Sequence, residues 1–119
     1  MSFAKKLQNL RPSWRAVIRQ WHEEFSFRIQ VFLCAGILLI SYVLHVSAIE
    51  LMILILAMGA VLAFESLNTA LEELCDHVTP QHHPRIGKIK DLGSGASLLI
   101  GIAATSVCLL IFTPRIISL

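Results

Sequence analysis

The chain has 119 residues, of which 55% are apolar and 15% are charged, and its mean hydropathy is +0.71. Soluble domains usually contain about 45–50% apolar and about 25% charged residues, so this composition is typical of an integral membrane protein. Ten Lys and Arg against eight Asp and Glu leave a net charge of +2, which is too small for a nucleic-acid-binding surface. The length excludes a two-domain soluble enzyme, and we expect one domain over residues 1–119.

The amino-terminal segment, residues 1–28, has apolar side chains at helical spacing with basic residues between them. This pattern predicts an amphipathic helix lying in the membrane interface, with Trp14 and Trp21 at headgroup level. Pro12 should interrupt this helix or begin its second, longer piece. A segment of this kind can also serve only as a membrane anchor, and the sequence leaves that alternative open.

Three apolar stretches follow, and each is near the roughly 20 residues that a membrane-spanning helix needs. They cover residues 29–48, 49–78 and 92–112, and the second extends beyond the membrane. All three should be helices, because an isolated strand cannot satisfy its backbone hydrogen bonds in lipid. The sequence therefore predicts an all-α, polytopic membrane protein with three transmembrane helices and an interfacial helix.

Basic residues are concentrated in residues 1–28 and in the connection 79–91, whereas residues 46–50 contain no Lys or Arg. Because basic segments remain on the cytoplasmic side of a membrane, the amino terminus and the second connection should be cytoplasmic. We expect the protein to reside in the cytoplasmic (inner) membrane.

The second apolar stretch ends in a stripe of polar residues at positions i, i+3, i+7 and i+11, which share one face of a helix. These residues are Glu65, Asn68, Glu72 and Asp76. The uncharged run 51–64 before them spans about 21 Å, so Glu65 should lie near the inner edge of the hydrocarbon, where an ionisable group indicates a functional site. The alternative is a helix that becomes polar only because it leaves the bilayer, but this explains the shared face poorly.

Other charged residues belong to the same interface. Glu23 and Glu24 end the amphipathic segment, and carboxylates from two separate helices can bind Mg²⁺ together with substrate phosphates. Lys90 and Asp91 precede the third stretch, and a lysine there can offset phosphate charge. Since Glu65 could accept a proton from a lipid hydroxyl, the residues together predict phosphoryl transfer at the membrane surface.

Three blocks of the sequence resemble the bacterial integral-membrane diacylglycerol kinase and undecaprenol kinase family. They are residues 13–28, residues 65–76 with Glu65-Ser66-Leu67-Asn68-Thr69-Ala70-Leu71-Glu72, and residues 82–96 with Lys90-Asp91-Leu92-Gly93-Ser94-Gly95-Ala96. The resemblance implies a homotrimer with active sites shared between neighbouring subunits. It also implies ATP as phosphoryl donor, Mg²⁺ as cofactor and a membrane lipid alcohol as acceptor.

The resemblance further implies roles for individual residues. Glu65 corresponds to the general base, Asn68 to a support for the catalytic carboxylate, and Glu24 and Glu72 to the metal-binding pair, while Lys90 is the third catalytic residue. The expected ATP contacts are Glu24, Glu72, Gln81, His82, His83, Lys90 and Asp91. The expected lipid contacts are Ser13, Trp14, Arg28, Glu65 and Ser94.

The acceptor lipid is the least determined part of this prediction. Residues 68–70 and the turn 79–84 look more like the undecaprenol kinase branch, which favours undecaprenol as acceptor and undecaprenyl phosphate as product. Diacylglycerol, giving phosphatidic acid, is the alternative, and Pro12, Ile29 and Gln30 depart from the pattern of related sequences at the lipid end. Two alternatives of another class are a small oligomeric cation transporter and a non-catalytic membrane subunit.

Overall fold

The computed structural model describes residues 2–79 and 83–119, and these ranges form five helices without a strand. The helices are α1 (Phe3–Gln8), α2 (Leu10–Glu23), α3 (Phe25–Val43), α4 (Ala48–Val78) and α5 (Pro84–Ile117). Of these, α3, α4 and α5 are long and apolar enough to cross a membrane. The predicted all-α fold with three membrane-spanning helices and an amino-terminal helix is confirmed.

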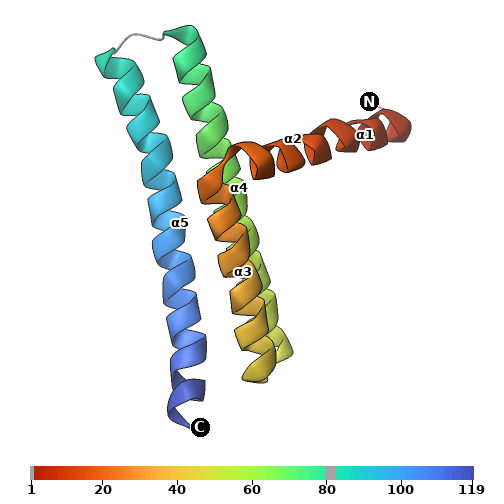
Figure 1. Cartoon of the computed structure of the whole chain (residues 1–119), viewed down its shortest axis with the longest axis vertical. Coiled ribbons are helices and arrows are strands. Elements are labelled where there is room, and N and C mark those ends of the chain that lie inside the picture. The colour runs from red at the N-terminus through yellow and green to blue at the C-terminus, as the bar shows by residue number, and fades with distance from the viewer. Residues whose placement is uncertain (1, 80–82) are drawn as a thin grey trace.

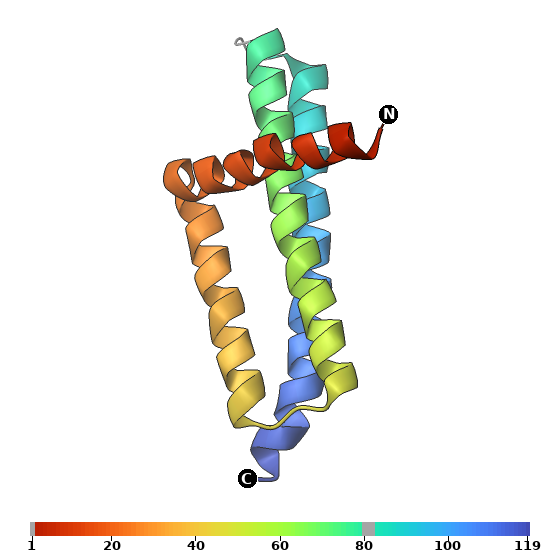
Figure 2. The same ribbon diagram turned by 90° about the vertical axis from the view of Figure 1, so that its right-hand side faces the viewer.

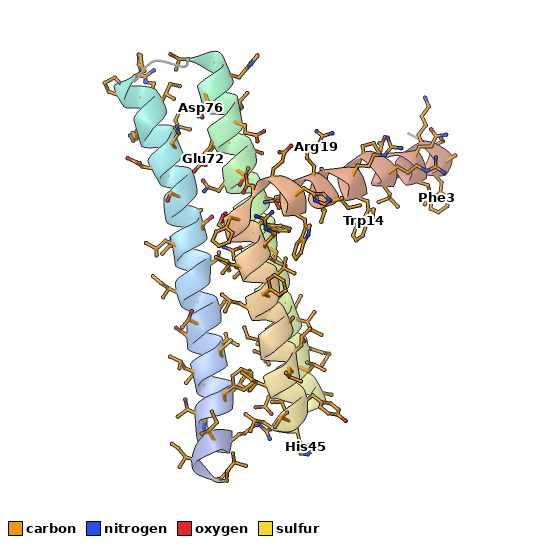
Figure 3. All side chains as sticks on the ribbon, in the orientation of Figure 1. Phe3, Trp14, Arg19, His45, Glu72 and Asp76 are labelled. Atoms are coloured by element: carbon orange, nitrogen blue, oxygen red, sulfur yellow. The ribbon has the colours of Figure 1, made fainter. Side chains whose placement is uncertain are left out.

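Helices α1 and α2 run across the three long helices at a steep angle (Figure 1). Asn9 separates the two pieces, and Pro12 lies in the first turn of α2, where its missing N–H costs no helical hydrogen bond. The side chains of Phe3 and Trp14 point toward the half of the molecule that contains α3, whereas Arg19 points away from it (Figure 3). This is the arrangement expected of an amphipathic helix lying flat on a membrane.

A sharp corner at Glu24 joins α2 to α3 (Figure 2). The Arg28 guanidinium donates through Nη1 to the carbonyl oxygens of Trp21 at 2.9 Å and His22 at 3.0 Å. These carbonyls belong to the last turn of α2, whose acceptors have no partner within the helix. Arg28 therefore holds the corner closed and fixes Glu24 at the junction of the interfacial and membrane-spanning parts.

Helices α4 and α5 pack against each other along much of their length, whereas α3 contacts α4 over a few residues only (Figure 2). The molecule is 54 Å long, which exceeds the roughly 30 Å hydrocarbon core of a bilayer. Both helices continue beyond the level of α2 (Figure 1). Helix α5 begins at Pro84, eight residues before the apolar run that starts at residue 92. His83 caps this helix and Pro84 occupies its first position.

The interior is small, with a core formed by Leu54, Met58 and Phe112. Most apolar side chains of the three long helices are exposed; for example, Leu56 and Leu110 are 74% and 76% exposed. An apolar surface of this extent is stable only against lipid or other protein chains. The single chain therefore has the surface of a membrane protein.

Arg115, near the end of α5, joins the ends of the helices that lie farthest from α2 (Figure 1). Its guanidinium forms an ion pair with Glu50 in the first turn of α4, and its Nη1 donates to the carbonyl oxygen of His45 at 3.2 Å. His45 has a left-handed backbone conformation, with φ of 54°. Arg115 thus links α5 to both ends of the α3–α4 connection.

We expect Arg115→Met to lower the melting temperature of the detergent-solubilised protein by a few degrees, because it removes an ion pair and a hydrogen bond between α5 and that connection. Circular dichroism at 222 nm would follow the unfolding. Arg115→Lys retains the charge and should recover part of the loss. An unchanged melting temperature in Arg115→Met would show that the contact does not stabilise the fold.

Candidate active site

Glu65 lies on α4 and is bound to the first turns of α3. Ser26 Oγ donates to Glu65 Oε1 at 3.2 Å, and Gln30 Nε2 donates to Glu65 Oε2 at 3.5 Å. Ser26 and Gln30 are one helical turn apart, so their side chains project from the same face of α3. The Glu65 carboxylate is half-buried between two helices and has both oxygens oriented by donors.

Glu24, at the corner between α2 and α3, is bound to α4 one turn beyond Glu65. Thr69 Oγ1 donates to Glu24 Oε2 at 3.0 Å. Ser66 Oγ donates to Gln20 Oε1 at 2.6 Å and attaches the last turns of α2 to the same face of α4. Two hydroxyl residues of α4 thus place a carboxylate from the interfacial segment beside the polar end of a membrane helix.

A hollow of about 440 Å³ lies between α2 and α4, within the range of roughly 300–1,000 Å³ common for small-molecule sites. Its polar lining residues include Ser13, Arg19, Gln20, Glu23, Glu24 and Glu73. The α4 carboxylate in this hollow is Glu73, which the sequence analysis did not select. Ser66, Thr69 and Glu73 follow one another at spacings of three and four residues, so they share one face of α4. This polar face could have identified Glu73 from the sequence.

Glu72 lies on another side of α4, nearer to α5. Asn68 Nδ2 donates to Glu72 Oε1 at 3.3 Å. One turn further, Lys90 Nζ of α5 donates to Asp76 Oδ1 at 2.9 Å. Asp76 projects from the part of α4 beyond the level of α2 (Figure 3). The polar stripe of α4 is therefore shared, because its Glu65 end contacts α3 and its Asp76 end contacts α5.

The other predicted site residues do not belong to the contacts around Glu65, Glu24 and Glu72. Trp14, Asp91 and Ser94 are exposed. Arg28 is used in the α2–α3 corner described above. His83 begins α5, where its Nδ1 accepts from the Arg85 backbone N–H at 3.2 Å. The two remaining predicted ATP contacts, Gln81 and His82, lie outside the described residues.

Carboxylate oxygens are the metal ligands that the described part of this region offers. Among residues 2–79 and 83–119, no three His, Cys, Asp or Glu side chains gather into a group able to hold a metal by themselves. Mg²⁺ commonly takes only one or two protein carboxylates and completes its coordination with water and substrate phosphates. Glu24, Glu72 and Glu73 offer oxygen ligands of the kind that this ion prefers.

Comparison with known proteins identifies a family and several relatives. The sequence model of the family described as "Prokaryotic diacylglycerol kinase" matches residues 11–112. The chain is 32% identical to an undecaprenol kinase of Bacillus subtilis over 78% of this chain and 76% of the relative. It is 36% identical to a diacylglycerol kinase of Synechocystis over 95% of this chain and 65% of the relative. It is 31% identical to a diacylglycerol kinase of Escherichia coli K12 over 85% of this chain and 84% of the relative.

Proposed function

This chain belongs to the prokaryotic diacylglycerol kinase family, and we propose that it transfers the γ-phosphoryl group of ATP to undecaprenol. Family membership makes the protein a membrane kinase that phosphorylates a lipid alcohol. This favours a kinase over a cation transporter or a non-catalytic membrane subunit. The choice of undecaprenol rests on residues 68–70 and 79–84, which look more like the undecaprenol kinase branch.

The observation that carries the proposal is the Glu65 carboxylate held between α3 and α4 by Ser26 and Gln30. Gln30 also lines an apolar groove between α3, α4 and α5 that extends to Phe112. A lipid alcohol can place its hydrocarbon chain along such a surface and its hydroxyl at the polar end. Glu65 then lies at the depth where the hydroxyl of a membrane lipid is found.

In the proposed reaction, Glu65 accepts the hydroxyl proton while the hydroxyl oxygen attacks the γ-phosphorus. The bond between the γ-phosphorus and the bridging oxygen breaks, so the products are a lipid phosphate and ADP. Glu24 and Glu72 would hold Mg²⁺, and the ion would supply charge neutralisation to the phosphates. Asn68 orients Glu72 by donating to it, and Lys90 offsets phosphate charge.

The hollow between α2 and α4, which Glu24 lines, supports a nucleotide site. Arg19 and Gln20 provide donors there, and Glu24 contributes its carboxylate. Holding both substrates at one interface would supply much of the rate by positioning. We further propose a homotrimer with active sites shared between subunits, and an inner-membrane orientation in which the amino terminus and the α4–α5 connection face the cytoplasm.

Lys90→Ala should lower kcat by about 10- to 100-fold, because a charge-assisted contact to phosphate contributes about 1.5–3 kcal/mol. Phosphorylation of lipid in mixed micelles would give the rate. Lys88→Ala is a matched control, since it removes the same charge two residues away. Loss of the assembled oligomer in Lys90→Ala, seen by size-exclusion chromatography, would instead indicate a structural role for Lys90.

The acceptor is tested by offering purified protein equal amounts of undecaprenol and diacylglycerol with ATP labelled at the γ-phosphorus. We expect label mainly in undecaprenyl phosphate. Label mainly in phosphatidic acid would replace the proposed acceptor with diacylglycerol and leave the lipid kinase assignment in place.

A further inference from the structure

Gly93 lies on α5 where this helix packs against Asn68 and Leu71 of α4. A Cβ atom at Gly93 would be 2.7 Å from Asn68 Oδ1 and 2.7 Å from Leu71 Cδ2. Both distances are too short for non-bonded atoms, so a larger residue would have to displace a side chain or separate the helices. At Gly95, a Cβ atom would meet nothing within 4 Å.

The Asn68 side-chain amide lies where α4 packs against α5, a contact called here the α4–α5 seam. Its nitrogen is hydrogen-bonded and its oxygen is buried. Its Nδ2 donates to Glu72 Oε1 at 3.3 Å. Its Oδ1 is buried without a hydrogen-bond partner in the part of the chain that the structure describes. The direction of an ideal Cβ at a glycine is also the direction of one Cα–H bond, so Gly93 points a C–H group at this oxygen, a weak contact that recurs between packed helices.

We propose that Gly93 is a positioning residue of the active site, because its missing side chain admits the Asn68 amide to the α4–α5 seam with Nδ2 directed at Glu72. The inference rests on the proposed function, in which Glu72 holds the metal and Asn68 supports it. A methyl group at Gly93 would push the amide out of the seam and withdraw Nδ2 from Glu72. A wider seam would also separate Lys90 from Asp76, which are 2.9 Å apart one turn away.

The test compares Gly93→Ala with Gly95→Ala, because both add one methyl group to the same helix. Gly93→Ala should lower kcat by about 10- to 100-fold, the effect of losing one hydrogen bond to a charged group. It should also raise the Mg²⁺ concentration needed for half-maximal rate. Gly95→Ala should change neither quantity.

A double-mutant cycle separates this role from simple helix packing. If Gly93 acts through Asn68, adding Gly93→Ala to an Asn68→Ala protein should cause no further loss of kcat. If Gly93 only provides space beside Leu71, Leu71→Ala should restore the activity of Gly93→Ala, and that result would overturn the inference. Asn68→Ala also removes the close contact between a Cβ atom at residue 93 and Asn68 Oδ1. The protein that carries both substitutions therefore remains informative when Gly93→Ala alone does not fold.

The inference is overturned if Asn68→Ala is impaired while Gly93→Ala keeps normal kcat and Mg²⁺ dependence. It is equally overturned if Gly93→Ala costs the same factor with and without Asn68. Full activity in Asn68→Ala would contradict the proposed role of Asn68 itself, and with it the inference. This result differs from the other two, in which only the role of Gly93 fails.

Discussion

Glu65→Gln is expected to lower kcat by about 10²- to 10⁴-fold, the range that a positioned general base usually contributes, with little change in the KM for ATP. Glutamine has nearly the same shape as glutamate, so its amide oxygen can still accept from Ser26 Oγ. It cannot accept the hydroxyl proton at neutral pH. The loss should therefore appear in the chemical step rather than in nucleotide binding.

Transfer of labelled phosphate from ATP to lipid would measure this effect, and binding of a non-hydrolysable ATP analogue would show whether the nucleotide site is intact. Glu65→Asp is a suitable control, because it keeps a carboxylate at this position and should retain more activity than Glu65→Gln. Near-normal transfer by Glu65→Gln would mean that another group accepts the proton. Weaker binding of the ATP analogue, together with a normal transfer rate at saturating ATP, would show that Glu65 belongs to the ATP site.

Glu72→Gln should raise the Mg²⁺ concentration that gives half-maximal rate by about 10- to 100-fold, because it removes one charged ligand oxygen from the proposed metal site. Steady-state rates over a Mg²⁺ titration at fixed ATP would measure the shift. The amide of Gln can still pair with Asn68, so the helix surface should be little disturbed.

Glu73→Gln provides the matched control for this experiment, since it makes the same charge change at the next residue. Glu73 lines the hollow beside Glu24, whereas Glu72 contacts Asn68 on the side nearer to α5. A larger shift in Glu73→Gln than in Glu72→Gln would assign the metal to the α2–α4 hollow and contradict the pair of Glu24 and Glu72.

The parts of the fold that follow from local pattern were predictable from sequence. Uninterrupted apolar runs define the three membrane helices, because lipid permits few other backbone structures. The helical period places Glu65, Asn68 and Glu72 on one side of α4, and the observed bond from Asn68 to Glu72 agrees with it. The start of α5 was not predicted, since its polar first turns have no apolar period to mark them.

Contacts between helices were not predictable in the same way. Ser26 with Glu65 and Thr69 with Glu24 join residues that are 39 and 45 positions apart. Such pairs depend on the angle and register at which α2 and α3 meet α4, which no local pattern specifies. The same is true of Glu73, because adjacent residues on a helix project about 100° apart and only the placement of α2 decides which one faces the hollow.

The most direct test of the proposed site is the electron paramagnetic resonance of Mn²⁺, used in place of Mg²⁺ with a non-hydrolysable ATP analogue. If carboxylates from the α2–α3 corner and from α4 hold one metal–nucleotide complex, wild-type protein should bind Mn²⁺ in a nucleotide-dependent way. Glu24→Gln and Glu72→Gln should each weaken that binding. Unchanged nucleotide-dependent Mn²⁺ binding in both variants would contradict a metal site built from these two segments.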